Sequence, residues 1–491
     1  MFPIGFVFAP IFLILLGLII GWYYIYFKFK RHLKGLPGPK QIPLLGIMIN
    51  VRNTVDIYNV LLSNIRKLGK NIFGMLGPFP TLITSDPKMF ALILGSPKHI
   101  NKPPLYTTLE NSAGNSLLLT NGDVWRRQRK LLNPGLDYTN VMQNINVFNT
   151  QSDDLIKALE GEINKESTEL ENFIETWALK QTYETMMGSN APEEDRNEFL
   201  ESIKTVMKIA VKRNVRLHEY YNITYVFTKN FWLERKCIKK ILHHTKNIIE
   251  DKKKEIKEES NKRERPILVD ILMKQKQTDK NVTYDFIAKQ LNLMVAAGFD
   301  TSGSAICFAL YNLAIFPEIQ KKAYEELHSI LGENINQFIT HQHVKEMKYL
   351  DLVIKESMRI KTTVPFFLRQ LKEDVDFEGM TLPKGLTVML LAYAMHLDPE
   401  VYPEPEKFVP ERFLQENLNP NRYGYAPFCG GVRNCIGQKY AQLSMKVVLA
   451  KILLHYELVD VNHELCLAAE ITLRSKTGVR VGIRKRMINN N

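Results

Sequence analysis

The sequence predicts a mostly helical protein with small β-sheets, preceded by a helix that spans a membrane. Apolar residues recur at spacings of three and four along much of the 491-residue chain, as in helices that pack on a core. Short strand-like runs occur at 386–392 and 479–483, and the segment 2–27 is mostly apolar. No Gly/Ser-rich linker or repeat divides the chain after residue 40, so we expect one large domain.

The N-terminal segment has the composition of a membrane anchor. It has no charged side chain before Lys28, and as a helix rising about 1.5 Å per residue it would exceed a hydrocarbon core of roughly 30 Å. A cleaved signal peptide would have basic residues before a shorter apolar stretch. Here the basic residues follow it, which places the rest of the chain in the cytoplasm. Four aromatic residues near its end would lie at the membrane interface: Trp22, Tyr23, Tyr24 and Tyr26.

A proline-rich segment separates this anchor from the main domain. Leu36-Pro-Gly-Pro39 ends any preceding helix and makes the chain that leaves the membrane conformationally stiff. We therefore expect an anchor at 1–27, a basic and proline-rich hinge at 28–40, and the main domain at 41–491.

The main domain is predicted to be built on helices. Residues 142–210 have the periodicity of amphipathic helices, and the densely charged segment 252–265 is expected to be an exposed helix end and loop. Residues 284–314 form a helix that is apolar nearly all round and is ended by Pro317. Such a helix lies inside a large core.

Charge and cysteine content exclude several classes of function. The formal net charge is +13, but no basic and aromatic module of known type is present, so no nucleic acid partner is expected. Part of the excess is solvated surface, and part favours anionic lipid and an acidic partner. The five cysteines are too few and too scattered for a disulfide framework, and without a CxxC pair or HExxH a zinc site is not expected.

One cysteine lies in a loop that suits a thiolate ligand to haem iron. Residues 428–437 read FCGGVRNCIG, with Cys435 two residues after Arg433 and two before Gly437. The glycines allow backbone conformations closed to other residues. A helix over 437–456 would direct its N-terminal dipole at the sulfur and help keep it deprotonated. The competing interpretation is an ordinary buried thiol, and we assign that packing role to Cys429.

The pattern F-x-x-G-x-R-x-C-x-G resembles the haem-binding loop of the cytochrome P450 family, and the resemblance covers essentially the whole chain. It implies the P450 fold and haem b, with iron bound by the Cys435 thiolate. It also implies that Phe428 contacts the haem and that Arg433 neutralises a propionate.

The long apolar helix contains AAGFDT at 296–301, which fits the oxygen-activation motif of the P450 family. Gly298, next to a small Ala297, would let the flat cofactor approach the helix. Thr301 can bond back to a carbonyl one turn earlier and open the helix ladder. With Asp300 it would form an acid–alcohol pair that relays protons during oxygen activation. Taken alone, a glycine in such a helix more often serves to let another helix pack closely against it.

Further residues take their roles from the same resemblance. Glu356 and Arg359 form an E-x-x-R pair one helical turn apart, which the family joins to an arginine, here Arg412, in a structural triad. A second E-x-x-R match at Glu193 and Arg196 is expected to be an exposed coincidence. Three residues are expected at the haem propionates: Trp125, Arg129 and Arg369.

Segments 105–119, 211–232 and 364–367 fall where the family lines its substrate pocket, although each also suits plain core. The segment 211–232 mixes aromatic and basic residues, which suits contact with the membrane.

Two motifs are similar to the family 4 branch, and to its insect members: RNCIGQKYA at 433–441 and WRRQRKLLNP at 125–134. Many fatty-acid ω-hydroxylases of that branch carry a glutamate, esterified to the haem, where this chain has Ala297. No such ester can form here.

The resemblance implies a monooxygenase in the endoplasmic reticulum membrane, with its catalytic domain in the cytosol. It would insert one oxygen atom from O₂ into a small apolar substrate. Electrons would come from NADPH through NADPH–cytochrome P450 reductase, with cytochrome b5 as a further partner. Two alternatives stay open: a haem-thiolate isomerase or dehydratase that needs no reductase, and a non-enzymatic haem or lipid binder.

Overall fold

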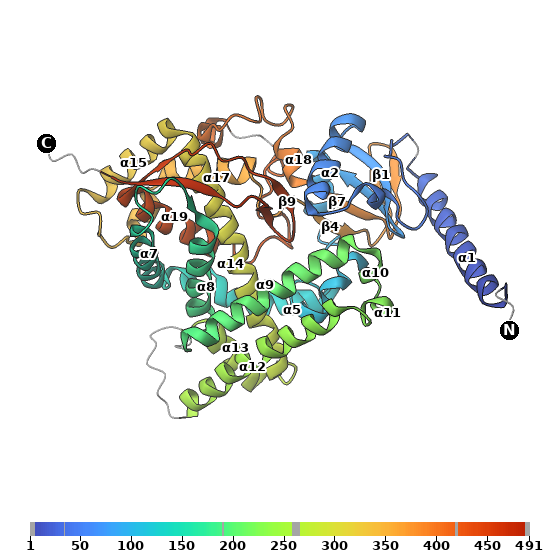
Figure 1. The fold of residues 1–491 in the computed structure, drawn as a ribbon, viewed down its shortest axis with the longest axis horizontal. Helices are drawn as coiled ribbons and strands as arrows, with labels where there is room; N and C mark the ends of the chain where they lie inside the picture. The colour runs from blue at the N-terminus through green and yellow to red at the C-terminus, as the bar shows by residue number, and fades with distance from the viewer. Residues whose placement is uncertain (1–4, 34, 189–190, 258–265, 418–420, 487–491) are drawn as a thin grey trace.

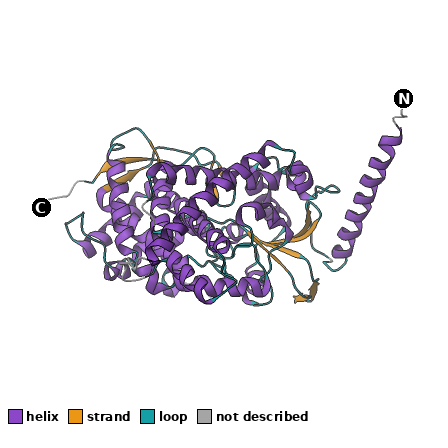
Figure 2. Ribbon diagram, turned by 90° about the horizontal axis from the view of Figure 1, so that it is seen from below, coloured by secondary structure: helices purple, strands orange, loops and turns teal. Residues whose placement is uncertain are grey.

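The protein is described here by a computed structural model of residues 5–33, 35–188, 191–257, 266–417 and 421–486. Helices form most of the molecule and surround the long helix α14, while the small sheets lie toward two sides of it (Figure 1). Helix α1 projects from the body, as the second view also shows (Figure 2). The predicted fold class, a mostly helical protein with small sheets, is confirmed.

The helices are α1 (Gly5–Lys30), α2 (Thr54–Leu68), α3 (Pro87–Gly95), α4 (Glu110–Ala113), α5 (Gly122–Leu132), α6 (Tyr138–Met142), α7 (Ile145–Glu160), α8 (Leu170–Met187), α9 (Glu193–Val215), α10 (Leu217–Tyr220), α11 (Asn222–Tyr225), α12 (Lys229–Lys257), α13 (Leu268–Thr278), α14 (Tyr284–Ile315), α15 (Pro317–Leu331), α16 (His341–Glu346), α17 (Lys348–Ile360), α18 (Ala392–His396) and α19 (Gln438–His455).

The strands are β1 (Asn71–Leu76), β2 (Phe79–Thr84), β3 (Thr168–Glu169), β4 (Phe367–Gln370), β5 (Val375–Phe377), β6 (Met380–Leu382), β7 (Thr387–Leu390), β8 (Tyr456–Val459), β9 (Leu467–Ala469), β10 (Leu473–Ser475) and β11 (Arg480–Lys485). The largest sheet has the order β1-β2-β7-β4, in which only β2 and β7 run parallel. The run expected at 386–392 is β7, and the run at 479–483 is β11.

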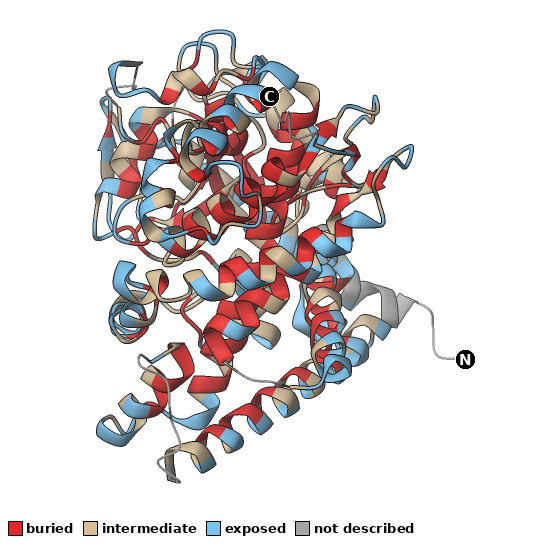
Figure 3. Cartoon of the chain, turned by 90° about the vertical axis from the view of Figure 1, so that its left-hand side faces the viewer, coloured by how far each residue is buried: buried red, intermediate tan, exposed pale blue. Residues whose placement is uncertain are grey.

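Helix α14 is the central element of the core. The Thr283 side chain caps its start by accepting a hydrogen bond from the Phe286 N–H, and the helix ends just before Pro317. It is long and apolar enough to cross a membrane, but most of it is buried inside the protein. Buried residues are concentrated in the interior of the molecule (Figure 3). Burial on nearly all sides explains why the sequence of α14 lacks an amphipathic pattern.

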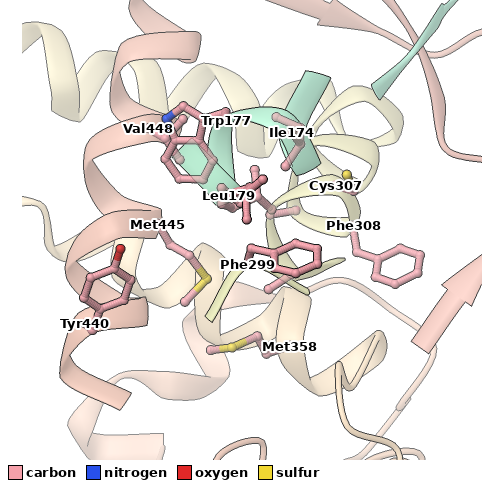
Figure 4. Packing of buried hydrophobic residues seen from close by; sticks show 14 of the residues in the cluster. Ile174, Trp177, Leu179, Phe299, Cys307, Phe308, Met358, Tyr440, Met445 and Val448 are labelled. Carbon is pink, nitrogen blue, oxygen red and sulfur yellow. The ribbon is translucent and has the colours of Figure 1, made fainter. Parts of the chain in front are cut away.

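The face of α14 that contains Gly298 packs against α8. A Cβ atom at Gly298 would lie 2.7 Å from the Cγ2 atom of Thr182 on α8. The next residue, Phe299, is buried among side chains of α8, α17 and α19, including Leu179, Met358 and Met445 (Figure 4). Gly298 is therefore a helix-packing residue. It was expected to let a cofactor approach, but it faces α8 and not the cofactor side of α14.

Helix α1 is exposed and apolar over most of its length, with a candidate membrane span at Phe12–Lys30. It continues three residues past the expected anchor boundary at residue 27. Trp22 was expected at a membrane interface, but its indole N–H donates to the Gly77 carbonyl oxygen at 2.9 Å and its ring is 4% exposed. The end of α1 thus docks on the β1–β2 hairpin, while Tyr24 remains exposed.

The segment 252–257 also differs in part from its expected exposure. Lys252, on the last turns of α12, is buried and pairs with Asp270 at 3.3 Å and Glu255 at 2.5 Å. Its neighbour Lys254 is exposed, as expected. Residues 258–265 lie outside the described residues.

A buried ion pair on α17 ties three separate segments together. Glu356 and Arg359 are both fully buried, and the guanidinium of Arg359 donates to both carboxylate oxygens at 2.7 and 2.9 Å. Glu356 also accepts from the Val409 N–H at 2.8 Å, and the Arg412 Nε lies 3.4 Å from it. The structure thus brings together the three residues of the expected triad.

The same pair is linked to the segment that leads to Cys435. Arg359 donates to the His396 carbonyl oxygen at 2.7 Å, and the His396 Nε2 accepts from the Ala426 N–H at 3.0 Å. Burial, with the nearby positive charge of Arg359, lowers the pKa of His396 to about 3. The imidazole is therefore neutral at physiological pH, which its acceptor role at Nε2 requires.

We predict that Glu356→Ala or Arg359→Ala lowers the free energy of unfolding by about 3–5 kcal/mol, because each change leaves a buried charge without its partner. Denaturant titration measures the loss. The matched control is Glu193→Ala in the second E-x-x-R match, whose side chain is 67% exposed. A comparable loss in that control would contradict the assignment.

Gly298→Ala is predicted to destabilise the protein by about 1–3 kcal/mol through overpacking against Thr182. Thr182 cannot easily move, because its hydroxyl donates to the Ala178 carbonyl oxygen at 2.6 Å. Adding Thr182→Ala removes the Cγ2 atom and should restore most of the thermal midpoint. If the second change gives no rescue, Gly298 does not have the packing role given to it.

Candidate functional site

A cavity of about 610 Å³ lies beside α14. Its walls come from α14, the loop before α19, strand β4 and the turn between β9 and β10, together with the segments 44–51 and 105–118. Most of the lining is apolar. The three segments expected at a substrate pocket all contribute, with Leu105, Val211 and Phe366 as examples.

Cys435 borders this cavity just before α19 begins. Its N–H donates to the Phe428 carbonyl oxygen at 3.0 Å, which closes the loop on itself. The thiol is accessible from the cavity but is otherwise surrounded by protein. Burial raises the pKa of Cys435 to about 11, and the Gly437 backbone N–H and the charge of Arg129 offset this only in part.

The helix dipole was expected to help keep this sulfur deprotonated, whereas burial acts in the opposite direction and favours the neutral thiol. A neutral thiol at pH 7 becomes a thiolate when a metal ion binds it, because the ion's charge replaces the proton. Cys435 is thus suited to bind a metal cation and is poorly suited to act as a free nucleophile.

Cys429 also borders the cavity, so its expected role as plain packing is incomplete. Its φ of 59° is rare for a residue other than glycine. Burial raises the pKa of its thiol, although Arg369 donates a hydrogen bond to it. At Gly431, by contrast, a glycine is required: φ is 69° and a Cβ atom would lie 1.7 Å from the Leu94 carbonyl oxygen.

Four cations gather near Cys435 without a carboxylate partner. They are Lys102, Arg129, Arg369 and Arg433. None of them forms an ion pair with an acid within the part of the chain that the structure describes. Unpaired cations in a buried site indicate an anionic ligand.

The guanidinium groups are held by uncharged partners. Arg433 donates to the carbonyl oxygens of Leu118 and Thr120 at 2.9 and 2.8 Å and lies 5.2 Å from the centre of the Trp125 ring. Burial, with the charge of Arg369, lowers the pKa of Arg433 to about 9. Arg129 donates to the backbone and side-chain oxygens of Asn434 at 2.7 and 3.0 Å.

Lys102 escaped the sequence analysis because no motif marks it. Its ammonium donates to the Tyr106 hydroxyl at 3.1 Å and lies 4.2 Å from that ring's centre. Burial, together with the charges of Arg369 and Arg433, lowers its pKa well below the usual range. An anion near this cluster would restore its charge.

Thr301 and Asp300 border the cavity from α14. The Thr301 hydroxyl donates to the Ala297 carbonyl oxygen at 2.7 Å, as its spacing indicated. The Asp300 carboxylate is 6% exposed and does not stand free beside it. It accepts hydrogen bonds from Arg474 and from the Thr472 hydroxyl, the latter at 2.9 Å.

Arg474, on β10, is a second residue that the sequence analysis missed. Its guanidinium also donates to Glu175 at 2.8 Å. Burial alone would lower the pKa of Arg474, but the carboxylates of Asp300 and Glu175 outweigh that effect and raise it. Only the fold brings the three residues together, since they are more than 120 positions apart in sequence.

The structure thus gathers seven of the nine expected site residues around one cavity: Trp125, Arg129, Asp300, Thr301, Arg369, Arg433 and Cys435. Gly298 faces α8 instead. Phe428 is packed against the core and accepts the Cys435 N–H through its backbone, without lining the cavity.

The residues fit a haem group. They offer one thiol that suits a metal, an apolar space beside it, and cations with no acid to neutralise them. Haem needs these features for its iron, its macrocycle and its two propionates respectively.

Comparison with known proteins agrees with this geometry. The family model described as "Cytochrome P450" matches residues 36–475. Cytochrome P450 4d2 of Drosophila melanogaster is 30% identical over 482 residues, covering 94% of this chain and 96% of the relative. Cytochrome P450 4c3 of the same species is 30% identical over 510 residues, with coverage of 98% and 95%.

A human relative, cytochrome P450 4V2, is 31% identical over 428 residues, which is 84% of this chain and 81% of the relative. The matches extend over nearly the whole chain and include the cysteine loop. The chain therefore belongs to the cytochrome P450 family of monooxygenases and resembles the family 4 members of insects and mammals.

Proposed function

We propose that this monooxygenase inserts one oxygen atom from O₂ into a small apolar substrate, with electrons from NADPH delivered by NADPH–cytochrome P450 reductase. The observation that carries the proposal is the position of Cys435, whose sulfur borders an apolar cavity next to four unpaired cations. Haem bound there through a thiolate supplies the activation of O₂.

Different residues of the chain would hold different parts of the haem. Cys435 provides the thiolate, and the Gly437 N–H donates a hydrogen bond to its sulfur. Arg129, Arg369 and Arg433 neutralise the propionates, and Trp125 contributes an apolar surface beside them. Ala297 leaves this position of α14 without a carboxylate, so the haem is held without an ester bond.

Thr301 and Asp300 control protons at the cavity edge. The Thr301 hydroxyl, now directed at the Ala297 carbonyl oxygen, is an exchangeable proton donor on the cavity side of α14. Asp300 accepts from Arg474, which pairs with Glu175, and Glu175 lies 2.5 Å from Lys204. Lys204 also lies 3.9 Å from the exposed Glu201, so charged groups continue from the cavity to the surface. This series of ion pairs holds the Asp300 carboxylate in place, and we propose that Asp300 and Thr301 themselves relay the protons.

The membrane location rests on two exposed apolar surfaces. Helix α1 provides the anchor, and Ile223, Phe227 and Trp232 are 78%, 86% and 65% exposed on the segment 211–232. Together they support attachment to the endoplasmic reticulum membrane with the catalytic domain in the cytosol. The net charge of +13 favours acidic electron donors, the reductase and cytochrome b5.

Cys435→Ser should abolish the thiolate band in the difference spectrum of the reduced protein with carbon monoxide, because a hydroxyl is a poor, neutral ligand. Cys429→Ser is the matched control, since its thiol borders the same cavity. That variant should keep the band. Loss of the band in the 429 variant alone would reverse the ligand assignment.

Asp300→Asn combined with Thr301→Ala should uncouple electron use from product formation. Haem should still bind, because neither residue touches the thiolate loop or the cation cluster. NADPH consumption would continue while hydrogen peroxide rises and product falls. The reason is that protons would reach the site through disordered water and no longer through this acid–alcohol pair. The measurement is the ratio of product to NADPH consumed.

An unchanged ratio in the double variant would sink the proton-route role of these two residues. The same assay separates the alternatives. An isomerase or dehydratase would form product without NADPH, and a binding protein would form none.

A further inference from the structure

The segment 216–249 exposes positive charge and apolar side chains but no acid. It comprises α10, α11 and most of α12, and its acids, Glu219 and Glu234, are 3% and 0% exposed. The solvent-facing charge of this segment is therefore of one sign. Six of its cations are exposed: Arg216, Lys229, Arg235, Lys236, Lys239 and Lys246.

Both acids are held inside the protein by hydrogen bonds. Glu219 accepts from the Arg216 guanidinium at 2.9 Å. Glu234 accepts from the Asn111 side chain and the Tyr225 hydroxyl at 2.8 and 3.0 Å. Neither carboxylate is available to neutralise the cations further along α12.

Four of the exposed cations form a stripe on α12, called here the basic stripe: Arg235, Lys236, Lys239 and Lys246. At 3.6 residues per turn these positions fall within about 100° of one another around the helix. The opposite side is buried and includes Cys237, Ile241 and Ile248. None of the four forms an ion pair with a described acid, whereas Lys240, next to the stripe, pairs with Glu198 at 2.6 Å.

The last turns of the same helix have the pattern of an ordinary solvated face. Lys253 pairs with Glu250 at 2.5 Å, and Lys254 pairs with Asp251 at 3.2 Å, each three residues apart. Pairs of this kind neutralise charge locally. The basic stripe has no such acids, so its charge remains available to an anionic partner outside the protein.

The stripe begins beside exposed aromatic side chains. Trp232 is 65% exposed on α12, and Phe227, in the connection before the helix, is 86% exposed. Basic and aromatic side chains together on one exposed helix face are typical of segments that lie in the interface of a membrane.

The β1–β2 hairpin links this segment to the membrane anchor. Its turn residue Gly77 accepts the Trp22 indole N–H of α1. The ring of Phe79, on β2, lies 6.3 Å from the ring of Tyr220 on α10. In Figure 1, α1 and α11 lie on the same side of the molecule, and α12 leads away from α11 along its lower edge. The anchor and the start of the stripe are thus held on one side of the protein.

We infer that the basic stripe binds the anionic headgroups of phospholipids in the cytosolic leaflet, while Phe227 and Trp232 enter the interface beside it. That leaflet carries phosphatidylserine and phosphatidylinositol, which attract basic residues held near the membrane surface. The inference rests on the membrane location in the proposed function and names the class of lipid that this surface takes.

The test measures lipid selectivity with the full-length haem-loaded protein in vesicles of phosphatidylcholine. Trace spin-labelled phosphatidylserine or phosphatidylcholine is added, and the motionally restricted fraction of each label gives the ratio of their association with the protein. We expect phosphatidylserine to be favoured at least about threefold at low salt. The preference should disappear at about 1 M salt, where the Debye length is about 3 Å. A ratio of one at low salt overturns the inference.

Lys236→Gln combined with Lys239→Gln and Lys246→Gln tests the stripe itself, because the basic end of α1 also attracts anionic lipid. We expect this triple variant to lower the ratio by about twofold or more, while the thiolate band with carbon monoxide stays unchanged.

The matched control removes the same charge from exposed residues of α15, α16 and α17: Lys321→Gln, Lys345→Gln and Lys348→Gln. This control should keep the wild-type ratio. Equal loss in both triple variants would mean that net charge alone sets the preference, and it would overturn the assignment to α12.

An acidic protein is the competing occupant of the stripe. If the α12 variant binds NADPH–cytochrome P450 reductase more weakly in phosphatidylcholine vesicles and keeps the wild-type lipid ratio, the stripe docks a protein and the inference is overturned.

Failure of the proposed function is seen separately. A protein that keeps the lipid preference but forms no product with NADPH and reductase overturns the monooxygenase proposal alone. A protein that the vesicles do not retain overturns the proposed membrane location, and the inference with it.

Discussion

The buried ion pair of Glu356 and Arg359 is the interaction on which the site depends. Neither charge reaches solvent, so each remains stable only while the other, and the hydrogen bonds around them, stay in place. Through hydrogen bonds with Val409 and His396 the pair fixes the chain on both sides of residue 400. His396 in turn accepts a hydrogen bond from the Ala426 N–H, in the segment before Cys435. The position of the thiolate is thus set by charge burial some distance away.

Helix α14 separates packing from chemistry by its two faces. Gly298 and Phe299 lie on the face that meets α8 and the core, while Ala297, Asp300 and Thr301 border the cavity. A helix that packs on the core with one face and lines a substrate cavity with the other is not amphipathic, because its second face meets an apolar space instead of water. The polar groups on that face are few, and each one has a bonded partner.

Charges of opposite sign have different partners in the cavity lining. Near Cys435 four cations have no acid beside them, whereas the two acids of the described lining, Asp300 and Glu470, pair with cations that lie outside it. The four cations are thus available to an anionic ligand, which suits the propionates of haem.

The sequence by itself determined the fold class, the central helix, the strands at β7 and β11, the cysteine loop and the Glu356–Arg359 pair. Each depends on local spacing: an apolar run, a loop pattern, or two charges one helical turn apart.

Only the tertiary structure decided that Gly298 faces Thr182, that Trp22 docks on the β1–β2 hairpin, and that Lys102 and Arg474 join the site. It also decided that burial raises the pKa of Cys435. The physical reason is the same in each case. A residue's direction, its burial and its distant partners depend on how elements pack against each other, and no local pattern in the chain records that packing.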